Sequence, residues 1–296
     1  MNARTWLVFV ALGIVWGIPY LFIKLAVREL SPFDVAWGRI TLAVLILLPL
    51  AWQRRALRPL RAHLAAVCAF GLLEFAIPYT LLALCERWIP SSVAGILIAA
   101  VPLTMVPISH LFGVHEPLGP RRLGGLLLGL AGVATLVGFG TVSGWRGWAG
   151  VACMLIITVC YATGPLVVQR HLHAVDSVGS LAGSLLFASA LLLIPAALTL
   201  PGHVPSRLTL ASIAVLGVLC TGLSMIAMFY LIKRAGAART SVVTYINPAV
   251  AALLGVVVLH ERLGFSGLGG LVLILSSCWL ATHGGHPPRA PAIEPG

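Results

Sequence analysis

The stretch Val93–Leu128, VAGILIAAVPLTMVPISHLFGVHEPLGPRRLGGLLL, decides the fold of this chain. In it an apolar run interrupted by Pro102 ends at His115-Glu116, and a short polar turn leads into a second apolar run. Residues 260–273 repeat residues 115–128 at a shift of 145 positions, with nine of fourteen residues identical. A one-residue slip upstream places Pro102 opposite Pro248. Such a period in a chain of 296 residues predicts two repeated halves.

The composition excludes a soluble globular protein. Hydrophobic residues make up 59% of the chain and charged residues 9%, against roughly 45–50% and about 25% in soluble domains. Uncharged runs of about 20 residues can each cross ~30 Å of hydrocarbon, so we expect a polytopic membrane protein whose surroundings are the lipid bilayer. The net charge of +11 would suggest a nucleic-acid partner in a soluble protein. Here the basic residues lie in short loops and report topology, so no nucleic acid is expected.

We expect an all-α membrane protein of ten transmembrane helices in two inverted-topology five-helix repeats. The repeats are residues 1–142 and 143–283, and the Gly/Pro-rich residues 284–296 are expected to form a disordered tail. The expected spans are 5–26, 34–52, 64–84, 91–113, 122–140, 148–168, 178–199, 209–232, 239–259 and 266–283. An odd number of spans in each half forces the halves into opposite orientations, an arrangement common in secondary transporters.

Lysine and arginine in the loops predict the orientation of the chain. With the N-terminus inside, twelve basic residues lie in inner segments and five in outer loops. The positive-inside rule therefore places both termini in the cytoplasm and the chain in the cell (inner) membrane as a multi-pass protein. Glu116 and Glu261 each close an apolar run, and we expect them to cap turns, with a gating role as the alternative. The motif from Gly125 to Gly129 predicts close helix packing, within the chain or across a homodimer interface.

Several marks in this order resemble the EamA type of the drug/metabolite transporter superfamily, which has two five-span halves. The marks are Trp16-Gly17 with Lys24, Ser31-Pro32 followed by Arg39, Pro102 followed by Glu116, and Pro248 followed by Glu261-Arg262. The resemblance covers essentially the whole chain apart from the tail. It implies a carrier of metabolites or drugs in the cytoplasmic membrane, and many members of the family are exporters.

Glu74 is the residue most indicative of function. It lies near the centre of the third expected span, where a carboxylate costs about 2.5–3.5 kcal/mol on insertion scales and should face a cavity or a partner. The alternative is a protonated packing glutamate. Pro78 frees the backbone carbonyl of Glu74 and kinks the helix, and Tyr79 adds a hydroxyl nearby. The repeat places Cys220 opposite Glu74, so the second half does without the acid.

The remaining substrate-binding candidates are polar, aromatic or proline residues near the middle of other spans. Pro102 and Pro248 interrupt corresponding spans of the two halves, which indicates a binding site at the repeat interface. Polar residues in a bilayer can equally join neighbouring helices. The other candidates are Thr221, Ser224, Thr244, Asn247, Trp16 and Tyr20. Lys24 is expected to extend to the membrane interface, and Arg39 to do the same or to attract an anionic substrate.

The sequence thus predicts a secondary transporter that moves a small organic metabolite or drug across the cytoplasmic membrane by alternating access, and the family resemblance implies an exporter. It lacks a nucleotide-binding P-loop, so the chain is not expected to hydrolyse ATP. Its six cysteines and nine histidines show no metal-ligand spacing, so no metal or other cofactor is expected. An intramembrane lipid-modifying enzyme is one alternative, but it needs clustered carboxylates or histidines, and the eight acidic residues are dispersed. A channel is the other alternative.

Overall fold

In the computed structural model, residues 3–112, 120–138, 142–235, 243 and 246–282 are described, and all their regular structure is helical. The α-helices are α1 (Ala3–Gly17), α2 (Pro19–Ala26), α3 (Pro32–Gln53), α4 (Leu64–Gly71), α5 (Ile77–Cys85), α6 (Ser91–Ile98), α7 (Val101–Leu111), α8 (Pro120–Gly138), α9 (Gly144–Val167), α10 (Ser177–Thr199), α11 (Arg207–Ala214), α12 (Ser224–Ala235), α14 (Ile246–Val257) and α15 (Phe265–Thr282). The other helical segments are the 3-10 helix η1 (Arg58–His63) and the π-helices η2 (Leu72–Ala76), η3 (Val168–Leu172) and η4 (Val215–Leu223).

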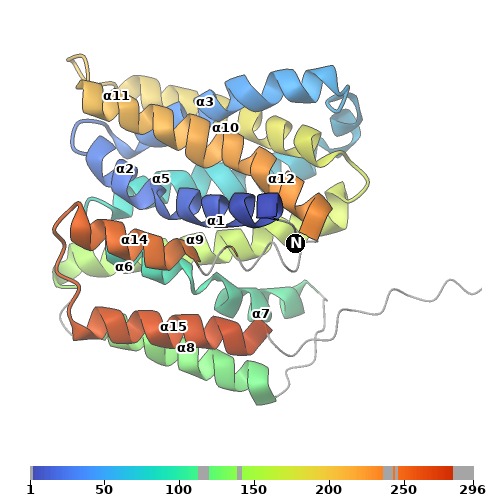
Figure 1. Ribbon diagram of the computed structural model, residues 1–296. Helices are drawn as coiled ribbons and strands as arrows, with labels where there is room; N and C mark the ends of the chain where they lie inside the picture. Colours follow the sequence, from blue (N-terminus) through green and yellow to red (C-terminus); the bar gives the residue numbers. More distant parts are fainter. Residues whose placement is uncertain (1–2, 113–119, 139–141, 236–242, 244–245, 283–296) are drawn as a thin grey trace, which may run out of the picture.

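The helices run roughly side by side between two ends of the molecule (Figure 1). We name these ends by residues. At the Glu261 end α2, α5 and α14 finish and α3, α6 and α15 begin. At the Arg170 end α7 and η3 finish and α8 and α10 begin. The pair α8 and α15 forms one edge of the bundle, and α3, α10 and α11 lie at the opposite edge (Figure 1).

The membrane character predicted from composition is visible on the surface. Large apolar side chains such as Leu198 (81% exposed) and Phe265 (96% exposed) face outward, as expected where lipid replaces water. Exposed tryptophans occur near both ends, with Trp6 and Trp52 at the Arg170 end and Trp145 at the Glu261 end. This distribution is typical of the aromatic belts at the two membrane interfaces.

A helical segment covers most of each of the ten expected spans. Six of them are long and apolar enough to cross a membrane, and α6 with α7 forms a seventh that is bent by 42°. The three remaining segments, Leu123–Leu136, Ile246–Val257 and Phe265–Ser277, are shorter within the described residues. The all-helical prediction is confirmed, whereas the count of ten spans remains a prediction. Residues 113–119, 236–242 and 284–296, with the predicted cap Glu116 and the predicted tail, lie outside the described residues.

The two repeated apolar runs pack against each other in opposite directions as α8 and α15. A Cβ added at Gly129 would lie 2.7 Å from the Ser277 hydroxyl, and one at Gly132 would lie 2.8 Å from Ile274. Adding the 145-residue shift to Gly129 and Gly132 gives positions 274 and 277, so the two contacts are equivalent under the repeat. In both pairs the residue numbers sum to 406. The contact therefore moves back along α15 as it moves forward along α8, so the two helices are antiparallel. The repeat is therefore inverted, and the close packing predicted for this span occurs within the chain.

Both predicted proline interruptions lie at helix starts. The fourth span breaks after α6, and α7 starts at Val101, so Pro102 occupies its first turn. Proline is tolerated there because the first helical N–H groups have no partner within the helix. Pro248 is buried in the first turn of α14. The first span also breaks, at Ile18, and Pro19 begins α2.

The helices of the two halves interlock. The α3 helix packs along α10 and η4, and α5 packs along α9. Hydrogen bonds between hydroxyl groups join the halves, including Thr41 to Ser189 at 2.8 Å and Ser31 to Thr199 at 2.6 Å. Ser31 also caps α3 through a reciprocal pair of hydrogen bonds with Asp34. Residues at the middle of the bundle are consequently supplied by both halves.

Candidate functional site

Glu74 lies in the π-helical segment η2, where the third span departs from regular α-helix. The π-turn absorbs the missing hydrogen bond at Pro78, which is buried in the first turn of α5. The Glu74 residue is partly exposed, but its Oε2 atom is buried and has no hydrogen-bond partner. It faces α9 at Gly164, where an added Cβ would lie 2.6 Å from Oε2. A buried acceptor without a donor is costly, so this oxygen is available to a ligand or a proton.

Span eight contains a second π-segment at the equivalent place. The slip of 146 residues that aligns Pro102 with Pro248 carries Glu74 to Cys220, which lies within η4. The hydroxyl of Thr221, the next residue, donates a 2.8 Å hydrogen bond to the Leu216 carbonyl within the π-segment. The Ser224 hydroxyl donates to the Cys220 carbonyl at 2.7 Å. Thr221 and Ser224 therefore stabilise the irregular helix of their own span.

Arg39 brings a positive charge to the same region. Its side chain is only 6% exposed, and Nε donates a 2.8 Å hydrogen bond to the Thr221 hydroxyl. The guanidinium carbon lies 3.7 Å from the centre of the Tyr79 ring, which is a cation–π contact. The prediction that Arg39 extends to the membrane interface is wrong. The only sequence signal for its burial was its distance from the start of the span.

Tyr79 and Tyr161 lie in the same region as Glu74 and Arg39. Each tyrosine lies within electrostatic range of both charged side chains. No ion pair joins Glu74 to Arg39 among the described residues, and neither charge has another partner of opposite sign there. We call Glu74, Arg39, Tyr79, Tyr161 and Thr221 the central cluster. It combines residues of α3, η2, α5, α9 and η4, and therefore of both halves.

The remaining predicted site residues occupy varied places. The Tyr20 ring is buried, and its hydroxyl lies beside the Asn247 side chain, whose Oδ1 atom is buried and unpartnered. Tyr20 is also within electrostatic range of Arg39. Trp16 packs in an apolar cluster with Phe9 and Leu231, which also includes Ile246, the residue before Asn247. Thr244 lies outside the described residues, as does the side chain of Pro102.

A second polar group lies at the Glu261 end, and the sequence did not indicate one of its members, Glu86. Lys24 Nζ donates hydrogen bonds to the backbone carbonyls of Glu86 and Ile89, the latter at 2.8 Å. Glu86 is fully buried, and its Oε2 accepts a 2.7 Å hydrogen bond from the Ser91 hydroxyl. Glu86 was missed because it follows an apolar run directly and resembles an ordinary loop glutamate.

Glu261 is a cap, as predicted, but for a helix of the other half. Its carboxylate oxygens accept hydrogen bonds from the backbone N–H groups of Ser91 and Ser92, at 2.7 and 2.9 Å. These N–H groups open α6, which has no side-chain cap of its own. The negative charge is favourable at the positive end of the helix dipole. Glu261 therefore ties the second half to the first at this end.

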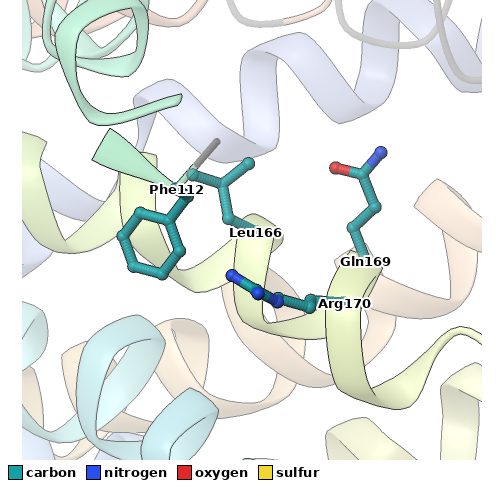
Figure 2. A pocket seen from close by; sticks show the side chains of 4 residues that line it. All are labelled: Phe112, Leu166, Gln169 and Arg170. Carbon is teal, nitrogen blue, oxygen red and sulfur yellow. The ribbon is translucent and has the colours of Figure 1, made fainter. Parts of the chain in front are cut away.

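The Arg170 end contains a small pocket between α7 and the end of α9. It is lined by Phe112, Leu166, Gln169 and Arg170. In Figure 2 the Arg170 guanidinium extends towards Phe112 and Leu166, whereas the Gln169 amide points away from it. Leu166 lies two residues beyond Gly164, which contacts Glu74. The pocket does not coincide with the binding site predicted at the repeat interface. It does include Leu166 of α9, which is the helix that Glu74 faces.

Comparison with known proteins identifies the family. The model of the EamA-like transporter family matches residues 4–138 and 148–282, which are almost the whole chain in two copies. The chain belongs to the EamA-like transporter family. This confirms the predicted family and makes the protein a multi-pass membrane transporter.

The relatives of this EamA protein cover nearly its full length. The Escherichia coli (strain K12) protein named "Uncharacterized inner membrane transporter YedA" is 31% identical over 96% of this chain and 93% of its own. The Bacillus subtilis (strain 168) protein named "Uncharacterized transporter YvbV" is 27% identical over 99% of this chain and 96% of its own. A solved structure titled "Crystal structure of protein" has a TM-score of 0.67 at 20% identity, with 95% of this chain and 97% of that chain covered. That likeness supports the fold alone.

Proposed function

We propose that this EamA protein is a ten-span secondary transporter, rather than an enzyme or a channel, that exports a small organic metabolite or drug. One observation carries the proposal: the Glu74 carboxylate lies inside a π-segment at mid-span with its Oε2 buried and unpartnered. Intramembrane carboxylates are costly and mark ion or substrate paths. A proton or a cationic substrate would neutralise Glu74. The state with a proton bound and the state with substrate bound would then differ in free energy.

The two ends of the molecule support alternating access. We propose that the Glu261 end is closed, because Lys24, Glu86 and Glu261 all make hydrogen bonds there to residues 86–92. The opposite end has the pocket beside Arg170. We propose that the Glu261 end is external and that both termini are cytoplasmic, so this conformation is closed to the outside. The excess of basic residues in the loops of the Arg170 end supports this orientation.

Flux measured in proteoliposomes at a series of pH values tests the role of Glu74. Glu74→Gln preserves shape but cannot titrate, so we expect normal folding with loss of the pH dependence of transport. Glu74→Asp should retain part of the activity. The charged or titratable groups around Glu74 are Tyr79, Tyr161 and Cys160, and Arg39 lies within electrostatic range of the same two tyrosines. Identical pH profiles for wild type and Glu74→Gln would show that Glu74 only packs. Absence of counterflow would indicate a channel.

A further inference from the structure

Three ionisable side chains meet at residues 86–92, which lead from α5 into α6. Lys24 donates hydrogen bonds to two backbone carbonyls of this segment, and Glu261 accepts hydrogen bonds from two of its backbone N–H groups. Glu86, the third ionisable residue, belongs to the segment itself. When all three side chains are ionised, two negative charges face one positive charge. A single proton on one of the two carboxyl groups would balance these charges.

Glu86 contains a buried oxygen that no protein group satisfies. Its side chain is fully buried, and its Oε2 atom accepts a 2.7 Å hydrogen bond from the Ser91 hydroxyl. The other carboxyl oxygen, Oε1, is buried and has no hydrogen-bond partner. An ionised carboxylate with an unpaired oxygen is costly to bury. Glu261 has a backbone N–H group on each of its oxygens, so a proton relieves the greater cost at Glu86.

The surroundings of Glu86 also favour a proton at this residue. Glu86 follows Cys85, the last residue of the third span, and so lies outside that span. Its pKa is raised to about 8, chiefly by burial. The charge of Lys24 and the hydrogen bond from Ser91 oppose this rise, whereas the charge of Glu261 adds to it. The proton would therefore be bound at neutral pH.

Among the described residues, the other ionisable groups around Glu86 supply no second buried positive charge. They are Tyr20 of α2, Cys85 of α5, Cys153 of α9, Arg87, His260 and Arg262. Phenol and thiol groups are ordinarily neutral at pH 7. Arg87 is exposed and donates a 2.8 Å hydrogen bond to the Leu30 carbonyl, and His260 and Arg262 are exposed as well. Glu86 and Glu261 therefore share the charge of Lys24.

We propose that Glu86 is a proton-binding site of the Glu261 end, separate from Glu74, and that release of this proton opens that end. Opening would admit water to both oxygens of Glu86 and so favour its ionised form. The proton therefore stabilises the closed conformation below the pKa that Glu86 has in the open one. This stabilisation is lost as pH rises through the pKa of the closed conformation. The inference rests on the proposed function, because it takes the Glu261 end as a gate.

Cysteine labelling at position 92 tests the inference on purified full-length protein in detergent. Ser92 is buried, so a single cysteine there should react with a maleimide only when the end opens. At each pH, the rate in the protein with Glu86 is divided by the rate in Glu86→Gln, which mimics the protonated form. This ratio cancels the pH dependence of the thiol itself. We expect the ratio to rise by up to about tenfold per pH unit between about pH 5.5 and 7.5, and to level off above about pH 8.

Two matched variants identify the residue that binds the proton. Glu29→Gln removes a different carboxylate at the same end, and Glu74→Gln removes the buried carboxylate of the third span. Both should keep the pH dependence of labelling. Its loss in Glu74→Gln would assign the proton to Glu74, which would overturn this inference and leave the proposed function intact. A ratio that does not change with pH, or that changes with Na⁺ concentration at constant pH, would also overturn it.

Infrared titration replaces the labelling experiment if Glu86→Gln does not fold. The sample is purified Glu74→Gln protein that carries isotope-labelled glutamate, so that the second buried glutamate does not contribute. We expect the band of a protonated glutamate carboxyl group to disappear near about pH 8. Loss of every such band below about pH 5, the range of exposed glutamates, would contradict the proposal.

Discussion

Gly164 of α9 lacks a side chain and so leaves the space that the Glu74 carboxylate occupies. An added Cβ would lie 2.6 Å from Glu74 Oε2, closer than real contacts of this kind. The carboxylate end of Glu74 can shift, so Gly164→Ala should fold and express normally but move the charge away from its ligand. Misplacements of this size at a reacting or binding group cost up to about 100-fold, so we expect transport to fall by about 10- to 100-fold. Gly124→Ala is the matched control, since its Cβ would meet only Leu280 at 3.7 Å. Equal flux in both variants would show that Glu74 tolerates the shift.

Glu29 gives the clearest expectation for how the stability of the protein depends on pH. Its carboxylate accepts a 2.7 Å hydrogen bond from the backbone N–H of Ser206, the N-cap of α11, and this lowers the pKa of Glu29. A lowered folded-state pKa contributes stability above the pKa of the unfolded chain and loses it as pH falls through the folded-state value. The melting temperature of wild type should therefore exceed that of Glu29→Gln at pH 7, and the difference should shrink in acid below about pH 4.5. A difference that grows in acid would contradict this assignment. The hydrogen bond lies at the surface of the molecule, so the effect should also weaken in high salt.

At the scale of the element, α6 depends on a carboxylate from the other half for its N-terminal cap. Loss of a capping charge costs about 1 kcal/mol, or about a fivefold change in an equilibrium. Glu261→Gln should therefore open the Glu261 end more often while leaving the α6 helix in place. A single cysteine at Ser92, which is buried, reports the opening through its rate of labelling by an impermeant maleimide. We expect about fivefold faster labelling in Glu261→Gln, with Glu29→Gln as a control that also removes a cap at this end. No change in rate would show that Glu261 only stabilises the helix.

The elements also show what the sequence could and could not predict. Hydrophobic runs and the repeat predicted the helices, the proline breaks and the mid-span position of Glu74, because these depend on local sequence. The burial of Arg39 and the partners of Lys24 could not be predicted because Thr221 and the Ile89 carbonyl are distant in the chain. Glu86 was missed altogether. The partner of the Glu261 cap was missed for the same reason, since α6 precedes it by about 170 residues. Packing between the halves determines these contacts, and this packing cannot be predicted from local sequence patterns.

For the whole molecule, the antiparallel packing of α8 on α15 implies that equivalent turns of the two halves lie on opposite sides of the membrane. Position 262 follows the Glu261 cap, and position 170 lines the pocket at the other end. Both arginines are exposed, so a single cysteine at either site of an otherwise cysteine-free protein should react with maleimide. In intact cells we expect an impermeant maleimide to label position 262, and position 170 only after the membrane is permeabilised. The reverse result would keep the inverted repeat but turn the molecule over, and would make the closed end cytoplasmic. Labelling of both sites from one side would contradict the odd number of crossings between them, because α10, the α11–α12 span and α14 separate position 170 from position 262.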